Sequence, residues 1–202
     1  MSQIFLTSSI SGVAHDIAPK IDAKKRHNMV FITTPTEPET ESLDWLKKDE
    51  NALIEAGFEY TKYTITGKDE KTVKNDLANF DIIFMSGGYT DYLAKMSEEC
   101  NLKNILHDLI YEKSKIYIGC SAGSIICGPN VPYYLWDEDK SYSGFDFVNF
   151  TLIPHWGSKD FREMYLSERL NIAYDSVPQP LIMLRDNQYI EIFDDNMKIF
   201  SL

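Results

Sequence analysis

The chain has 202 residues, of which 44% are hydrophobic and 13% aromatic, so it can bury a substantial core within a single domain spanning residues 1–202. Its formal net charge of −11 at pH 7 argues against a nucleic-acid-binding or anionic-membrane-binding protein, because binding to phosphates requires a basic surface. We expect neither a signal peptide nor a membrane span, since no basic segment precedes a long apolar run.

Strands and helices are predicted to alternate along the first 130 residues. Short apolar runs indicate strands at 4–6, 29–33, 58–65, 81–85 and 115–118. Apolar residues at helical spacing indicate helices at 43–56, 73–80 and 102–110, with a short one starting at Asp91. Strands joined by helices favour right-handed crossovers and therefore a largely parallel sheet.

The remainder of the chain predicts two more strands, a helix and a hairpin. Strands are expected within 145–153 and at 180–184, and a β-hairpin at 189–201 adds antiparallel strands at one edge of the sheet. The intervening helix, 160–173, is expected to bury Phe161, Tyr165, Leu166 and Leu170. The predicted fold is a three-layer α/β domain.

The stretch 115–126, KIYIGCSAGSII, has the layout of a nucleophile elbow. A buried strand leads into Gly119-Cys120-Ser121-Ala122-Gly123, and a helix can begin directly afterwards. The tight turn would expose the Ser121 side chain, and the flanking glycines remove Cβ atoms that would clash there. The N–H of Ala122 would be free to bind an oxyanion. A glycine-containing turn that only packs tightly is the alternative, but the strand–turn–helix context favours a catalytic serine.

Further polar or glycine residues directly follow other predicted strands. Gly87-Gly88, His155 and Asp186 each come at or just after a strand end, where parallel strands place their ligand sites. His155 would accept the proton of Ser121, Asp186 would orient the imidazole, and Gly88 would supply the second oxyanion N–H. Each residue also has an ordinary structural interpretation, as a packing histidine, a turn aspartate or a βα turn.

Several rival residues occupy comparable positions. Cys120 is a second candidate nucleophile, but the glycines lie two residues either side of Ser121, so Cys120 is expected to face the packed interior. Rival triad acids occur in the loop Asp137-Glu138-Asp139, although consecutive acids are more often solvated. His15 is a weaker rival base. The sequence contains no nucleotide-binding glycine motif and no clustered metal ligands, so we expect no cofactor and no metal.

These motifs resemble the peptidase E (aspartyl dipeptidase) and cyanophycinase family of serine peptidases over most of the chain. The similarity is carried by residues 84–90 (FMSGGYT), 117–123 (YIGCSAG), 153–155 (IPH) and 184–187 (LRDN). The resemblance implies a fold similar to the class I glutamine amidotransferases and a triad of Ser121, His155 and Asp186. Tyr89 stands where the family often has asparagine, and the family acid can be glutamate where Asp186 stands.

The resemblance also indicates a substrate. It implies hydrolysis of short peptides, with dipeptides carrying an N-terminal aspartate as the expected substrate and an acyl-enzyme on Ser121. Arg162 is a candidate for pairing with a substrate carboxylate, and Asp137 a candidate for meeting the substrate amino group. There are two alternative hypotheses. The chain could be another amide or ester hydrolase that uses the same triad, or a non-catalytic small-molecule-binding protein on this scaffold. The three cysteines, an odd number without metal-type spacing, favour a cytoplasmic location.

Overall fold

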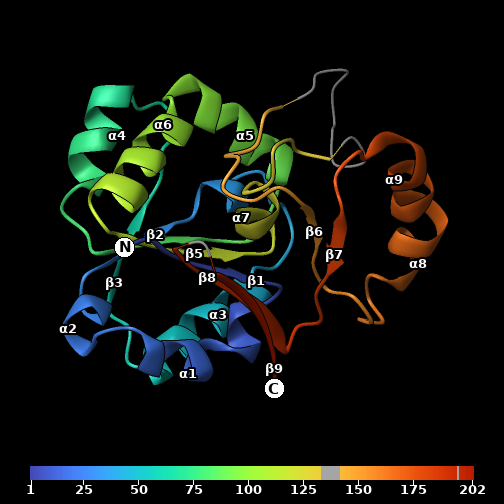
Figure 1. The fold of residues 1–202 in the computed structure, drawn as a ribbon, viewed down its shortest axis with the longest axis horizontal. Coiled ribbons are helices and arrows are strands. Elements are labelled where there is room, and N and C mark those ends of the chain that lie inside the picture. The colour runs from blue at the N-terminus through green and yellow to red at the C-terminus, as the bar shows by residue number, and fades with distance from the viewer. Residues whose placement is uncertain (133–141, 195) are drawn as a thin grey trace.

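The computed structural model describes residues 1–132, 142–194 and 196–202, and its centre is a seven-stranded sheet (Figure 1). In spatial order the strands are β3 (Tyr60–Tyr63), β2 (Met29–Ile32), β4 (Ile82–Met85), β5 (Ile116–Cys120), β1 (Gln3–Thr7), β8 (Gln188–Phe193) and β9 (Asn196–Ser201). The first five are parallel to one another, whereas β8 is antiparallel to both β1 and β9. The predicted parallel sheet with a C-terminal antiparallel hairpin is confirmed.

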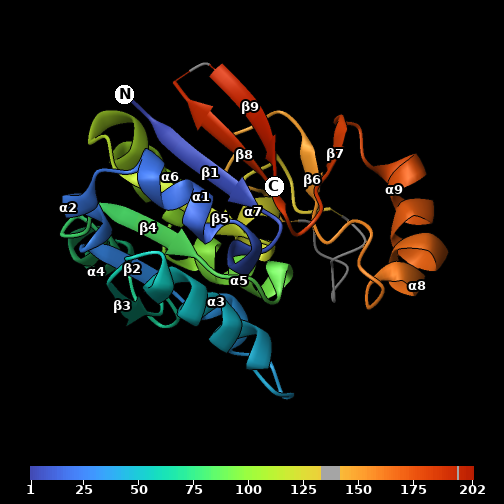
Figure 2. The ribbon, with the colours of Figure 1, turned by 90° about the horizontal axis from the view of Figure 1, so that it is seen from below.

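Helices cover both faces of this sheet, which gives the three layers. Figure 1 shows one helical layer above the sheet and one below it, and Figure 2 looks onto the sheet from below. One layer consists of α1 (Ala14–Ile17), α2 (Ala23–Arg26) and α3 (Asp44–Glu55). The other consists of α4 (Glu70–Leu77), α5 (Thr90–Glu99), α6 (Leu102–His107) and α7 (Ala122–Ile125). Short 3-10 turns lie at Ile10–Gly12, Ala18–Lys20 and Thr34–Thr36, and a π-helical turn at Asp108–Glu112 continues α6.

Strand side chains alternate between two buried clusters, one on each face of the sheet. In β1, Ile4 and Leu6 join the cluster beneath α4–α7, while Phe5 joins the cluster beneath α1 and α3. Tyr117 of β5 faces the first cluster and its neighbour Ile118 the second. Because all the residues of β1, β2, β4 and β5 except Gln3 are buried, these strands read as continuous apolar runs, as interior parallel strands do.

The strands that precede His155 and Asp186 form a sheet of their own. β6 (Thr151–Ile153) and β7 (Leu181–Met183) pair in parallel with each other and not with the seven-stranded sheet. Beyond them lie α8 (Arg162–Met164), a π-helical turn at Tyr165–Arg169 and α9 (Leu170–Ser176), at the right of Figure 1. The expectation that Leu166 faces inward is wrong: it is 53% exposed, whereas Tyr165 is buried. The prediction assumed the 3.6-residue period of an α-helix, whereas the π-helical turn has more residues per turn and so changes which side chains face inward.

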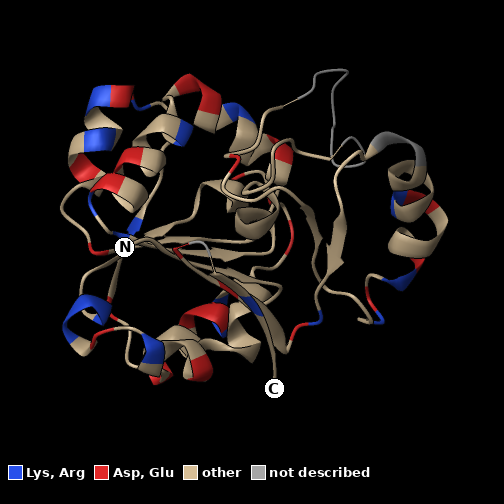
Figure 3. Ribbon diagram, in the orientation of Figure 1, with Lys and Arg blue, Asp and Glu red and all other residues tan. Residues whose placement is uncertain are grey.

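Charged side chains are distributed over the helical layers. Figure 3 shows acidic and basic residues interspersed on the helices and few charges on the inner strands. Among the described residues, no helix is both long and apolar enough to cross a membrane.

Candidate active site

The end of β5 forms a strained turn that carries Ser121. Its backbone angles are φ 48° and ψ −106°, a region that non-glycine residues adopt only where the surrounding structure enforces it. The Ser121 N–H donates to the carbonyl of Thr7 over 3.0 Å, which fixes the turn to the neighbouring strand β1. A Cβ on Gly119 would lie 2.5 Å from the Gly123 carbonyl oxygen, and one on Gly123 would lie 2.4 Å from that of Met85. The two glycines therefore allow α7 to pack directly on the strands.

Ser121, His155 and Asp186 form a continuous chain of hydrogen bonds. The Nε2 atom of His155 lies 3.0 Å from the Ser121 hydroxyl oxygen, and its Nδ1 atom lies 2.7 Å from Oδ1 of Asp186. The backbones of their two segments are joined as well, since the N–H of Trp156 donates to the Leu184 carbonyl over 2.9 Å. The sequence predicts that these three residues converge from the ends of neighbouring strands of one sheet. Instead, Ser121 comes from the large sheet, and His155 and Asp186 come from β6 and β7.

The charge state of Asp186 fixes the roles of the two imidazole nitrogens. The hydrogen bond from His155 holds the pKa of Asp186 below its ordinary value, against the opposing effect of burial, and the hydroxyl of Ser8 lowers it further. An ionised carboxylate can only accept hydrogen bonds, so the proton of the neutral imidazole sits on Nδ1. The lone pair of Nε2 then points at the Ser121 hydroxyl, as required of a base that removes its proton.

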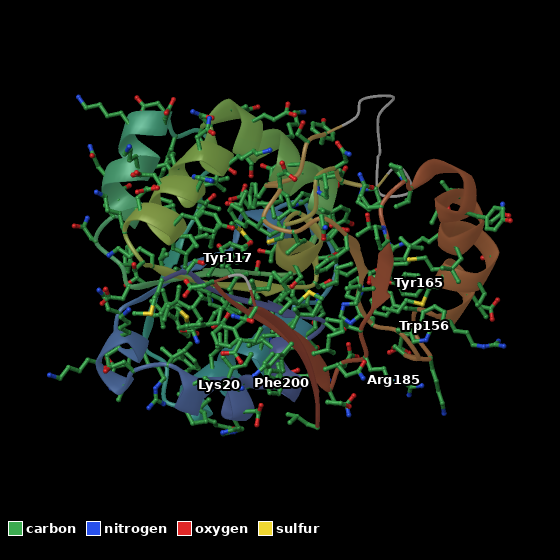
Figure 4. The ribbon with its side chains drawn as sticks, in the orientation of Figure 1. Lys20, Tyr117, Trp156, Tyr165, Arg185 and Phe200 are labelled. Atoms are coloured by element: carbon green, nitrogen blue, oxygen red, sulfur yellow. The ribbon has the colours of Figure 1, made fainter. Side chains whose placement is uncertain are left out.

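His155 is held in place from several directions. Its backbone has φ 58°, a left-handed conformation that non-glycine residues seldom adopt. The ring of Phe161 stacks on the imidazole with 4.6 Å between the ring centroids and 13° between the planes. The hydroxyl of Tyr165 donates to the carbonyl of Pro154 over 2.5 Å, and Figure 4 shows Tyr165 and Trp156 near β7 and α8. These contacts leave the imidazole side chain only 17% exposed.

Two backbone N–H groups lie in the turns next to Ser121. Gly88 has φ 127°, and a Cβ there would lie 2.2 Å from the Pro35 carbonyl oxygen, so only glycine fits. That carbonyl accepts the N–H of Tyr89 over 2.8 Å, while the N–H of Gly88 makes no hydrogen bond within the described part of the chain. Ala122 is the first residue of α7, and its N–H therefore has no partner within the helix.

Cys120 points away from this site, as the spacing of the glycines predicts. It is buried, and its thiol lies 3.7 Å from Oδ2 of Asp49. Burial, with the nearby Asp49 carboxylate as a smaller contribution, raises the pKa of the thiol well above its ordinary value, so Cys120 is not a thiolate nucleophile. Asp49 itself is buried, which raises its pKa to about 6, and it accepts the N–H of Ser11 over 3.2 Å.

Arg162 and His15, two further predicted site residues, do not join this hydrogen-bonded chain. Arg162 begins α8 with an exposed side chain, and its guanidinium lies 3.1 Å from the Glu163 carboxylate. His15 is exposed on α1. Asp137 and its neighbours Glu138 and Asp139 lie outside the described residues. Among the residues that the structure does describe, no group of three or more His, Cys, Asp or Glu side chains is arranged to hold a metal ion.

Sequence reasoning missed two residues that contact the hydrogen-bonded chain of Ser121, His155 and Asp186. Phe161 was expected only as an inner helix residue, yet its ring stacks on His155. Ser8 is fully buried, and its hydroxyl contacts both Asp186 and the backbone of His155. Ser8 could have been predicted as a site residue from its position directly after the first strand, because Ser121 and Gly88 also follow strands.

Comparison with known proteins matches the sequence to a described family. The model of peptidase family S51 matches residues 4–200. Uncharacterized peptidases from Listeria monocytogenes and Pasteurella multocida are each 26% identical to this chain, over 81% of it and 82% and 81% of their own lengths.

Solved structures share the fold. A crystal structure of a protein provisionally called peptidase E, from Listeria monocytogenes EGD-e, superposes with a TM-score of 0.84 at 22% identity and covers 100% of this chain and 99% of its own. A peptidase from an acI-B1 Actinobacterium gives a TM-score of 0.72 at 19% identity, covering 100% and 88%. The family model matches nearly the whole length of the chain, and the matched region includes the serine at the strand-to-helix turn. The chain therefore belongs to peptidase family S51, a family of serine peptidases.

Proposed function

We propose that this serine peptidase hydrolyses short peptides through an acyl-enzyme on Ser121, and that dipeptides with an N-terminal aspartate are its preferred substrates. The observation that carries the catalytic part is the hydrogen-bonded chain from Ser121 through His155 to Asp186, which starts on a strained turn. The preference for aspartate rests on the family resemblance and on the candidate role of Arg162.

In the proposed reaction, the Ser121 hydroxyl attacks the peptide carbonyl while Nε2 of His155 takes its proton. Asp186 stabilises the imidazolium that forms. The N–H groups of Gly88 and Ala122 bind the negative charge that develops on the carbonyl oxygen. His155 then gives the proton to the leaving amine, and it activates the water molecule that hydrolyses the acyl-enzyme.

Substrate recognition is proposed to involve Arg162 and Asp137. Arg162, the first residue of α8, directly follows Phe161, whose ring stacks on the imidazole of His155. A guanidinium can bind a carboxylate in a bidentate manner, and the substrate would replace Glu163 as its partner. Asp137 would meet the substrate amino group. We further propose a cytoplasmic location, which the three free cysteines support.

A dipeptide panel tests the proposal. Wild type and Ser121→Ala are compared on Asp-Xaa, Asn-Xaa and Ala-Xaa dipeptides with the same second residue. We expect Asp-Xaa to be hydrolysed fastest and Ser121→Ala to be inactive. Equal rates on the three series would remove the aspartate preference and leave the hydrolase. If no peptide is hydrolysed and a fluorophosphonate probe does not label Ser121 in the folded protein, the chain is not a serine hydrolase and a binding role replaces the catalytic one.

A further inference from the structure

The buried hydroxyl of Ser8 joins the loops that carry His155 and Asp186. Ser8 is the first residue after β1 and is fully buried. Its Oγ lies 2.7 Å from Oδ1 of Asp186 and 2.6 Å from the backbone nitrogen of His155. One side chain that follows a strand of the large sheet thus contacts both residues that follow the strands of the small β6–β7 sheet.

The directions of these two hydrogen bonds follow from the chemistry of the groups. The backbone N–H of His155 can only donate, so the Ser8 oxygen accepts from it. The single hydroxyl proton of Ser8 is then available for Asp186, which as a carboxylate only accepts. Oδ1 of Asp186 therefore receives two hydrogen bonds, from Ser8 and from Nδ1 of His155, at 2.7 Å each.

Residues 7–12, the segment that contains Ser8, also contact the segment of Ser121. The carbonyl of Thr7 accepts the N–H of Ser121 over 3.0 Å and the hydroxyl of Ser124 over 2.8 Å. At the other end of the loop, Gly12 packs so closely on the backbone of Asp186 that a Cβ would lie 2.1 Å from its carbonyl oxygen. Residues 7–12 therefore touch the segments of Ser121, His155 and Asp186.

We propose that Ser8 is a positioning residue for the reaction, holding the Asp186 carboxylate and the left-handed backbone of His155 in the geometry that lets His155 reach Ser121. This role rests on the proposed function. It is needed because the triad spans two sheets that do not pair with each other, so their relative position must be set by contacts such as this one. Ser8 does not itself touch the reacting atoms, and it acts through its two partners.

The rate at which a fluorophosphonate probe labels Ser121 measures this role without depending on the peptide substrate. Ser8→Ala removes one donor from Asp186 and leaves the N–H of His155 without its acceptor. We expect labelling and kcat on the best dipeptide to fall by about tenfold to a hundredfold, with KM within about twofold. The matched control is Ser9→Ala. The Ser9 hydroxyl pairs with that of Ser11 at 2.8 Å and not with the triad, so its rates should stay within about twofold of wild type.

A double-mutant cycle separates positioning from general damage to the fold. Because Ser8 also accepts the N–H of His155, only the part of its effect that passes through Asp186 should disappear, so Ser8→Ala should lower labelling by a smaller factor in the Asp186→Asn background than in the wild type. Should circular dichroism show that Ser8→Ala does not fold, Ser8→Cys replaces it. The thiol is larger than the hydroxyl but keeps a weak donor and a weak acceptor at this position, and we expect a smaller loss than in Ser8→Ala with the same coupling.

Three results would overturn the role of Ser8. Labelling of folded Ser8→Ala at the wild-type rate would remove it while leaving the proposed function intact. An equal loss in the wild-type and Asp186→Asn backgrounds would show that Ser8 does not act through Asp186. Absence of labelling of the wild type, by contrast, would remove the proposed function and the role of Ser8 together.

Discussion

Replacing Asp186 by asparagine tests the acid of the proposed triad. The substitution keeps the size of the side chain and an acceptor oxygen but removes the negative charge that faces Nδ1 of His155 at 2.7 Å. Two opposite unit charges about 4 Å apart interact by about 1 kcal/mol in water and about 4 kcal/mol at a partly screened protein site. The Asp186 side chain is 49% exposed, which places it between these limits.

The charge of Asp186 matters most when His155 becomes an imidazolium in the transition state. Losing about 1–4 kcal/mol there corresponds to a fall in kcat of about fivefold to a thousandfold. Steady-state kinetics on the best dipeptide measure this fall, and Asp137→Asn, at the rival acid that we propose to bind substrate, is expected to lower kcat by less. If Asp137→Asn reduced kcat more than Asp186→Asn, the triad acid would belong to the acidic loop, and the assignment of Asp186 would be wrong.

Two buried groups lead to predictions about stability. Burial raises the pKa of Asp49 from 3.8 to about 6. The unfolded chain therefore releases this proton at a lower pH than the folded chain does, and the free energy of unfolding falls by about 2 kcal/mol as pH rises from about 4 to about 6. In urea titrations across this range, Asp49→Asn should lack that decline, and an unchanged pH dependence would contradict the cause given. Tyr117 donates its hydroxyl to the Gly123 carbonyl over 2.7 Å, so Tyr117→Phe should lower the free energy of unfolding by about 1 kcal/mol, because Cys127 still donates to that carbonyl. Denaturation by urea at fixed pH measures this loss, and an equally stable variant would show that the hydrogen bond contributes nothing net.

Patterns of neighbouring residues were sufficient to predict the large sheet. The apolar run at 115–118 and the glycines around Ser121 predicted both the strand and the turn, because close packing of α7 on β5 leaves no room for Cβ atoms there. The same spacing predicted that Cys120 points inward. Local patterns predict such features because the strand, the turn and the helix follow one another directly in the sequence.

Pairing between distant segments could not be predicted in the same way. β6 and β7 have three residues each, and nothing in such short runs tells whether they extend the large sheet or pair only with each other. The exposure of Leu166 also escaped prediction, because a π-helical turn shifts the helical phase by a fraction of a turn.

The sequence by itself thus determined the parallel α/β sheet, the strained turn at Ser121 and the identity of the strand-end residues His155 and Asp186. Only the tertiary structure decided that these residues come together from two separate sheets and that Ser8 lies between them. The physical reason is that hydrophobic periodicity encodes which face of a strand is buried, whereas hydrogen bonds between loops depend on how the strands are placed relative to one another.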